Sequence, residues 1–430
     1  MVASEETGKG AIGARGLSGV GAASLLSALS GFVILFVVAR VLSPAENSEF
    51  LAYWGALFAV YGILFGVIAE TTRAVGRAEL DREAPMPEGA GGRPRGASVV
   101  GAALIVGAGL AALVAAVGFP FADQLFGSQG TAIVALLAVS CLFYAWHAAI
   151  AGSLQGLRLW QPYTKLVTME ALFRLLAVVT VALASGTLFG IELACLAALA
   201  AAPVLFSGSR SARAASRARA DIPMAPFLRQ TGQALISAAS SAALLVSFPI
   251  LVKVTTAPDA YELAAPLLLA ISLTRAPIML PLQAFQGVAI SAVLRARDEG
   301  AGAVRRPIGA VLAAGVIGAA LAWLIGPWLM LLFGPDYLVA GWVLAALTLD
   351  AALIALLTLS GTALLALGRH RVYALGWLLA TVVAVGFLLI PDSTELRCIL
   401  SLTVGPLCGI VLHFAALLRG DRSERRVRDQ

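Results

Sequence analysis

The feature that most constrains this chain is a series of long apolar runs that recur from one end of the sequence to the other. A helix needs about 20 apolar residues to cross the ~30 Å hydrocarbon core of a bilayer. Lipid offers no partners to unpaired backbone groups, so each run must be helical. We therefore predict an all-α integral membrane protein of about twelve transmembrane helices. The predicted helices are Leu17–Val41, Phe50–Ala69, Ser98–Phe121, Thr131–Leu154, Leu166–Ser185, Leu188–Phe206, Gln230–Val254, Ala260–Leu282, Ile308–Leu332, Val339–Ala366, Val372–Ile390 and Cys398–Leu418.

Composition and motifs narrow the function classes. Only 13% of the 430 residues are charged, about half the share in soluble domains. No P-loop (GxxxxGKS/T), HExxH or GxSxG motif is present, so the sequence predicts neither an ATP-driven pump nor an enzyme. The four cysteines lie in apolar runs without metal-ligand spacing, and the histidines His147, His370 and His413 are predicted to be packing or interface residues. We expect no cofactor, no metal and no nucleic-acid partner.

The basic residues predict the orientation in the membrane. With the N-terminus inside, 25 of the 30 lysines and arginines fall in inside segments, and Arg397 alone falls in an outside loop. Positively charged loops stay on the cytoplasmic side. The sequence therefore predicts that both termini are cytoplasmic and that the protein lies in a cytoplasmic membrane. One missed or extra helix would scramble this pattern, so the pattern also supports the helix count.

An internal repeat predicts two similar halves. Eight of eighteen positions match between Gly21–Val38 and Ser237–Val254, which are offset by 216 residues. We predict two six-helix lobes of the same orientation, related by an axis along the membrane normal. Residues 1–206 form the first lobe and residues 230–418 the second. Residues 207–229 are a basic cytoplasmic linker, and residues 419–430 are a basic tail.

Charged residues inside the predicted helices are the candidate site residues, because burying charge in a membrane is costly. Arg275 lies near the middle of the eighth helix, which contains Pro266, Pro277 and Pro281. A kinked helix with a central arginine suits an anion-binding cavity, since guanidinium binds phosphate in bidentate fashion. The alternative is a structural ion pair with Asp350 on the tenth helix.

Four further intramembrane charges have two interpretations each. Glu170 and Arg174 are one helical turn apart, so they either neutralise each other or place Arg174 in a cavity with Glu170 as a coupling group. Arg40 and Lys253 lie near the outer ends of equivalent helices, where they either snorkel to the surface or line the outer half of a cavity. Glu192 on the sixth helix has no predicted role.

Two segments carry a resemblance to a known family. The first helix ends in Val38-Ala39-Arg40-Val41-Leu42-Ser43-Pro44 and continues through Glu49-Phe50, which resembles the opening of the polysaccharide (O-antigen-type) flippases. Leu332-Phe333-Gly334-Pro335-Asp336-Tyr337, followed by Ala366-Leu367-Gly368-Arg369, is similar to the second-half signature of that family. These flippases belong to the multidrug/oligosaccharidyl-lipid/polysaccharide (MOP) superfamily.

The resemblance implies a transport function. Such proteins move a polyprenyl-diphosphate-linked saccharide from the cytoplasmic to the outer leaflet by alternating access around a cationic cavity. In this sequence Arg174 and Arg275 are the cations that the resemblance places in such a cavity, and Arg40 and Lys253 are further substrate-binding candidates from their positions in the helices. The partners expected are the membrane, the lipid-linked saccharide, a polysaccharide polymerase and glycosyltransferases.

Two other functions stay open. One is a multidrug or metabolite antiporter of the same fold, and the other is a non-transporting scaffold of a polysaccharide assembly complex. An antiporter favours an acidic cavity. In a scaffold, all buried charges would be paired.

Overall fold

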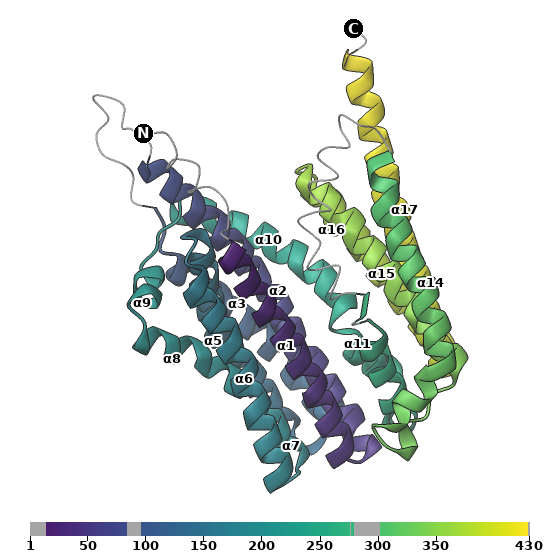
Figure 1. Cartoon of the computed structure of the whole chain (residues 1–430). Coiled ribbons are helices and arrows are strands. Elements are labelled where there is room, and N and C mark those ends of the chain that lie inside the picture. The colour runs from purple at the N-terminus through teal and green to yellow at the C-terminus, as the bar shows by residue number, and fades with distance from the viewer. Residues whose placement is uncertain (1–13, 84–95, 276, 279–301, 429–430) are drawn as a thin grey trace, which may run out of the picture.

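In the computed structural model the chain is a bundle of long helices (Figure 1). The structure describes residues 14–83, 96–275, 277–278 and 302–428, and within these ranges it holds helices and turns with a single isolated β-bridge. The elements of the first half are α1 (Ala14–Val41), α2 (Pro44–Glu83), α3 (Val99–Gly118), η1 (Phe119–Phe121), α4 (Ala122–Phe126), η2 (Gly127–Gln129), α5 (Gly130–Gly156), α6 (Trp160–Ala184), α7 (Leu188–Cys195), η3 (Leu196–Ala200), α8 (Ala201–Gly208) and α9 (Arg210–Ser216). Those of the second half are α10 (Met224–Leu245), α11 (Phe248–Thr255), α12 (Pro258–Glu262), a helix at Ala265–Arg275, α14 (Gly302–Leu331), η4 (Pro335–Tyr337), α15 (Gly341–Ala366), α16 (His370–Leu388) and α17 (Thr394–Arg428).

The helices have the length and composition of membrane spans, as predicted. Within the described ranges nine helical stretches are long and apolar enough to cross a bilayer, or ten if the bent pair α10–α11 forms one span. One stretch, Val99–Gly156, has 58 residues, which is about 87 Å of helix at 1.5 Å per residue and too long for one crossing. It contains two of the predicted helices, joined by η1, α4 and η2. The predicted span Ala260–Leu282 lies partly outside the described residues.

The same pairs of helices pack together in the two halves of the chain. In the first lobe α1 packs on α6, α3 on α5, and α6 on the α7–α8 segment. The second lobe repeats these pairs, with α10 on α16, α14 on α15, and α16 on α17. α1 and α10 run in the same direction (Figure 1), as the repeat between their sequences requires.

The repeated first helices differ in shape. α1 is one continuous helix, whereas α10 and α11 meet at a bend of 65°. The break falls at Val246 and Ser247, and Pro249 follows in the first turn of α11. A proline is tolerated in a first turn because the amide it lacks has no partner there. The bend therefore distinguishes the second lobe from the first.

The lobes also contact each other along α2 and α10. A side-chain Cβ on Gly66 would lie 2.7 Å from the backbone of Ala234, and one on Gly62 would lie 2.9 Å from the Cβ of Ala242. Glycine at these positions lets the two backbones approach closely. α2 is accordingly central in the bundle. Of its most apolar stretch 67% is buried, whereas 11% of the corresponding stretch of α14 is buried.

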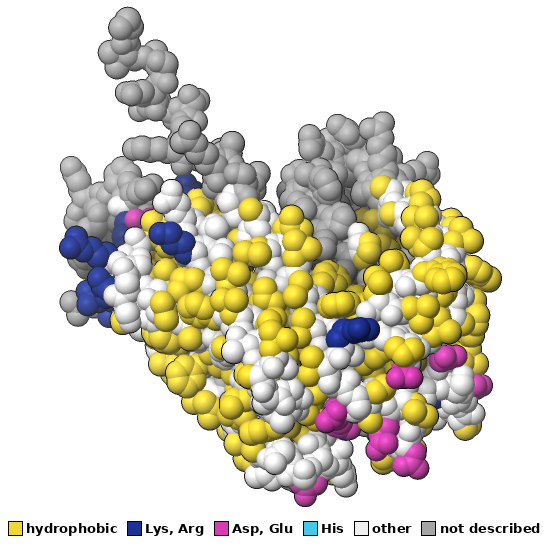
Figure 2. All heavy atoms as spheres, turned by 60° about the horizontal axis from the view of Figure 1, so that its bottom comes forward, with side chains coloured by type: hydrophobic (Ala, Val, Ile, Leu, Met, Phe, Trp, Pro, Cys, Tyr) yellow, Lys and Arg dark blue, Asp and Glu magenta, His cyan; other side chains and the backbone are white. Residues whose placement is uncertain are grey.

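Charge divides the two ends of the bundle (Figure 2). Acidic side chains are concentrated at the end that comes forward in this view, whereas most of the visible lysine and arginine side chains lie at its left edge, away from that end, and one basic group lies in the middle of the surface. The connections at the acidic end contain Glu46, Glu49, Asp123, Asp259, Glu262, Asp336, Asp392 and Glu395.

Candidate functional site

The charges predicted to line a cavity lie in separate places, each with its own partners. Glu170 and Arg174 are in the first lobe, Arg275 and Asp350 in the second, and Lys253 lies at the acidic end between the lobes. Arg40 is exposed in the last turn of α1, as snorkelling predicts.

The first-lobe charges form a buried cluster of three residues. Arg174 is 6% exposed, and its Nη2 donates to Oε1 of Glu170 at 2.8 Å. His147 on α5 places Nε2 3.3 Å from the other carboxylate oxygen, Oε2. The intrahelical pair predicted as one alternative is thus present. The sequence did not indicate the contact with His147, because helical spacing does not show which faces of α5 and α6 meet.

Aromatic rings surround this cluster. Tyr61 stacks on Tyr144 at a centroid distance of 3.8 Å, and Tyr144 stacks on His147 at 5.1 Å. The Cζ of Arg174 lies 4.9 Å from the ring centroid of Phe58 and 5.7 Å from that of Tyr61. Arg174 Nε, His147 Nδ1 and Tyr61 Oη are buried with no hydrogen-bond partner among the described residues. The cluster therefore keeps free hydrogen-bonding capacity in an apolar setting.

Arg275 lies against the bend between α10 and α11. Its Nη1 donates to the carbonyl oxygens of Leu244 at 3.1 Å and Leu245 at 3.0 Å, and its Cζ is 5.5 Å from the ring centroid of Phe248. A broken helix leaves its last carbonyls without intrahelical amide partners. Arg275 supplies donors to two of them, and its Nη2 has no partner in the described part of the chain.

The predicted kink at Pro266 is not seen. Pro266 is the second residue of the helix Ala265–Arg275, where proline fits without bending the helix. Pro277 lies among the described residues just beyond that helix, and Pro281 lies outside them. The bend that Arg275 contacts belongs to the neighbouring segment α10–α11.

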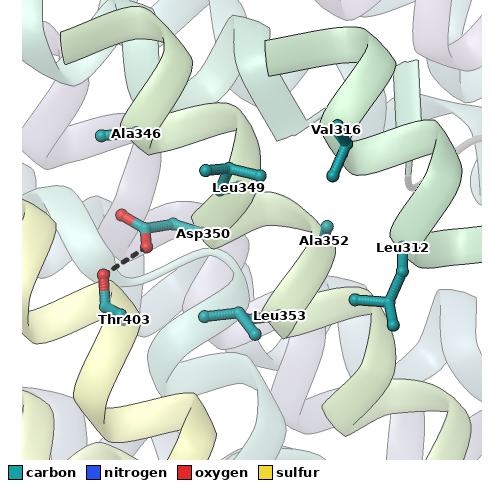
Figure 3. Close-up of a pocket in the computed structure, with 8 residues that line it drawn as sticks. All are labelled: Leu312, Val316, Ala346, Leu349, Asp350, Ala352, Leu353 and Thr403. Atoms are coloured by element: carbon teal, nitrogen blue, oxygen red, sulfur yellow. Dashed lines mark hydrogen bonds between the residues drawn. The ribbon is translucent and has the colours of Figure 1, made fainter. Parts of the chain in front are cut away.

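Asp350 forms no ion pair with Arg275 in the described structure. Its Oδ1 accepts a hydrogen bond from the Thr403 hydroxyl at 2.6 Å, and its Oδ2 has no partner there. Asp350 and Thr403 line a cavity of about 280 Å³ between α14, α15 and α17. Leu312 and Val316 of α14 face α15 across this cavity (Figure 3). Thr403 was not predicted, because a threonine inside an apolar run carries no distinguishing pattern.

Lys253 is paired, which neither interpretation of its position had predicted. Its Nζ binds Oε2 of Glu49 on α2, and it lies 5.0 Å from the ring centroid of Tyr261. The Lys253 side chain is 9% exposed, so it does not snorkel. Glu192 is buried, and its Oε2 has no partner among the described residues.

Several mycobacterial proteins have similar sequences. No family model matches the chain. The uncharacterized protein Rv3630 of Mycobacterium tuberculosis is 35% identical over 425 residues, which cover 98% of this chain and 96% of that protein. The uncharacterized protein Rv1510 of the same organism is 35% identical over 401 residues, covering 93% and 91%. The chain belongs to the family of these mycobacterial proteins.

Solved structures with the same fold are transporters of the MOP superfamily. A multidrug resistance MATE family transporter of that superfamily in an inward-facing conformation gives a TM-score of 0.68 at 15% identity, covering 91% of this chain and 95% of that one. A multidrug resistance MATE family transporter in an outward-facing conformation gives a TM-score of 0.63 at 13% identity, covering 96% of each chain. A MOP superfamily transporter from Pyrococcus furiosus, described as having a binding pocket of reverse polarity, gives 0.62 at 15% identity, covering 94% of each chain. This family therefore has the MOP transporter fold, which confirms the predicted fold class.

Proposed function

We propose that this protein is a secondary transporter that flips a polyprenyl-diphosphate-linked saccharide from the cytoplasmic to the outer leaflet. The observation that supports this proposal most is a pair of intramembrane arginines, one in each lobe. Arg174 Nε and Arg275 Nη2 are both buried, and neither has an acceptor among the described residues. Each guanidinium holds its position through its other nitrogens and keeps an N–H available for an anion.

The chemistry of the substrate matches these donors. A diphosphate is doubly negative and its sugar is polar, so neither crosses hydrocarbon unaided. Charge-assisted hydrogen bonds from guanidinium replace the hydration that the phosphates lose. The prenyl tail needs no such help, since it stays among the lipid chains.

The charge distribution supports the proposed orientation. The basic end of the bundle would face the cytoplasm, because positively charged loops remain on that side. Both termini would then be cytoplasmic, in the cytoplasmic membrane of a bacterium. Glu170 and Asp350 are the candidates for coupling transport to an ion gradient, and a polymerase and glycosyltransferases are the proposed partners on the synthetic route.

A multidrug or metabolite antiporter is the second candidate. It is favoured by the buried acids Glu192 and Asp350, which each have one carboxylate oxygen without a partner in the described structure. Such oxygens suit a proton or an organic cation. The fold is shared with multidrug transporters, so the fold does not separate the two candidates.

Flipping in proteoliposomes tests the first candidate directly. The purified protein is reconstituted with a polyprenyl diphosphate carrying one fluorescent hexosamine, and a membrane-impermeant quencher reports the labelled lipid in the outer leaflet. We expect the quenched fraction to rise from about half towards completeness within minutes. Vesicles without protein are the control. A protein that instead leaves this lipid in place and exchanges ethidium for protons would support the antiporter.

A further inference from the structure

Three consecutive residues at the start of α2 each bind a different element of the second lobe. Asn47 donates from Nδ2 to the hydroxyl of Tyr337 in η4 at 2.8 Å. Ser48 accepts at its carbonyl from the hydroxyl of Tyr261 in α12 at 2.8 Å. Glu49 pairs with Lys253 of α11. All these contacts lie at the acidic end of the bundle.

The Asn47–Tyr337 and Ser48–Tyr261 contacts are buried and the Glu49–Lys253 pair is partly buried, although all three join polar groups. Asn47 is 1% and Ser48 0% exposed. Tyr261 and Tyr337 are each 2% exposed. The Ser48 hydroxyl also donates to the carbonyl of Glu262 at 3.3 Å. Buried polar side chains at a helix terminus need partners, and here most of these partners come from the other lobe.

The turn after α14 places Tyr337 for this contact. Gly334 has φ +147°, a conformation that side-chain-bearing residues rarely adopt. The 3-10 turn Pro335–Tyr337 follows directly, and the Tyr337 side chain turns inward while Asp336 stays exposed. Beside it, the ring centroids of Phe333 and Phe36 lie 5.4 Å apart, which adds an apolar contact between the lobes. The Phe-Gly-Pro-Asp-Tyr motif thus has a structural use in this chain.

We infer that Asn47, Ser48 and Glu49 form a polar latch that closes the acidic end of the transporter. The latch consists of these three residues with Tyr337, Tyr261 and Lys253. It depends on side-chain contacts and one carbonyl, so it can open while every helix stays intact. Water entering an opened end would replace each lost hydrogen bond. The latch rests on the alternating-access part of the proposed function and is independent of the substrate.

Distance measurement between the lobes tests the latch without any substrate. Spin labels are attached at Ser128 and Asp392, which are exposed at the acidic end of the first and second lobes. The four native cysteines are first replaced by alanine. Pulsed electron paramagnetic resonance in lipid nanodiscs then gives the distribution of distances between the labels.

The latch variant carries Asn47→Ala, Glu49→Gln and Tyr337→Phe. We expect the population at longer distances to increase at least twofold over the parent. The control is Ser43→Ala with Glu46→Gln, since among the described residues the side chains of Ser43 and Glu46 form hydrogen bonds only with groups of each other. We expect this control to leave the distribution as in the parent.

A charge exchange covers the case in which the latch variant does not fold. Glu49→Lys alone should increase the longer-distance population, and adding Lys253→Glu should return it to the parent value. Unchanged distances in a folded latch variant, or no return in the exchanged pair, would overturn the inference. The flipping assay fails or succeeds separately, because these distances are measured without a lipid-linked saccharide.

Discussion

At the residue scale, the buried pair Glu170–Arg174 predicts an asymmetric response to mutation. Removing Arg174 leaves the Glu170 carboxylate with His147 as its one partner among the described residues, and breaking a buried ion pair costs about 3–5 kcal/mol. We expect Arg174→Gln to lower the melting temperature clearly, and Arg174→Gln with Glu170→Gln to recover most of the loss. Arg40→Gln is the control, because Arg40 is exposed. Fluorescence-detected chromatography after heating measures all four proteins. Equal losses in the single and double variants would show that the unpaired Glu170 carboxylate is not the cause of the destabilisation.

Arg275 has both a structural and a proposed binding role, and substitutions separate them. Arg275→Ala leaves the carbonyls of Leu244 and Leu245 without their donor, at about 1–3 kcal/mol for each buried group. We therefore expect Arg275→Ala to lower stability and also to abolish flipping.

Arg275→Lys should keep a donor near the bend and restore flipping only partly, because a point charge lacks the guanidinium fork. Asp350→Ala should not rescue Arg275→Ala, since the described structure contains no ion pair between them. Rescue would show that the two residues pair in another conformation of the protein.

At the scale of elements, the seam between α2 and α10 depends on glycine. We expect Gly66→Ala to force the two backbones apart, because the added Cβ would meet Ala234 and Leu235 at 2.7 Å. Gly109→Ala is the matched control, since nothing lies within 4 Å of its Cβ position and alanine favours a helix. Thermal stability should fall only in the first variant. A Gly66→Ala protein as stable as the parent would show that α2 and α10 can move apart at little cost in stability.

The helices were more predictable than their contacts. Long apolar runs fix where spans lie, because the bilayer thickness sets their length, and α14 to α17 follow the predicted runs closely. The bend at Val246–Ser247 was not predicted, although Pro249 gave a signal for it: proline has no amide to donate to the carbonyl of Leu245 and disrupts a helix on its N-terminal side.

The positions of charged residues within the helices were predictable from the sequence, and their contacts were not. Costly intramembrane charge identified Arg174, Arg275 and Asp350. The partners His147, Thr403 and Glu49 depend on which helix faces meet in space, and a single sequence does not contain that information.

At the scale of the whole molecule, labelling from outside tests the proposed orientation. Cysteines are introduced one at a time at Ser128, Asp336 and Arg217 in a cysteine-free protein. Ser128 and Asp336 lie at the acidic end and Arg217 at the basic end, and all three are exposed. The excess of arginine and lysine at one end predicts that this end remains in the cytoplasm.

In intact cells an impermeant maleimide should therefore label Ser128→Cys and Asp336→Cys, and should reach Arg217→Cys only after lysis. Labelling of Arg217→Cys in intact cells, with protection of the other two, would reverse the orientation. The latch at the acidic end would then close the cytoplasmic side of the transporter.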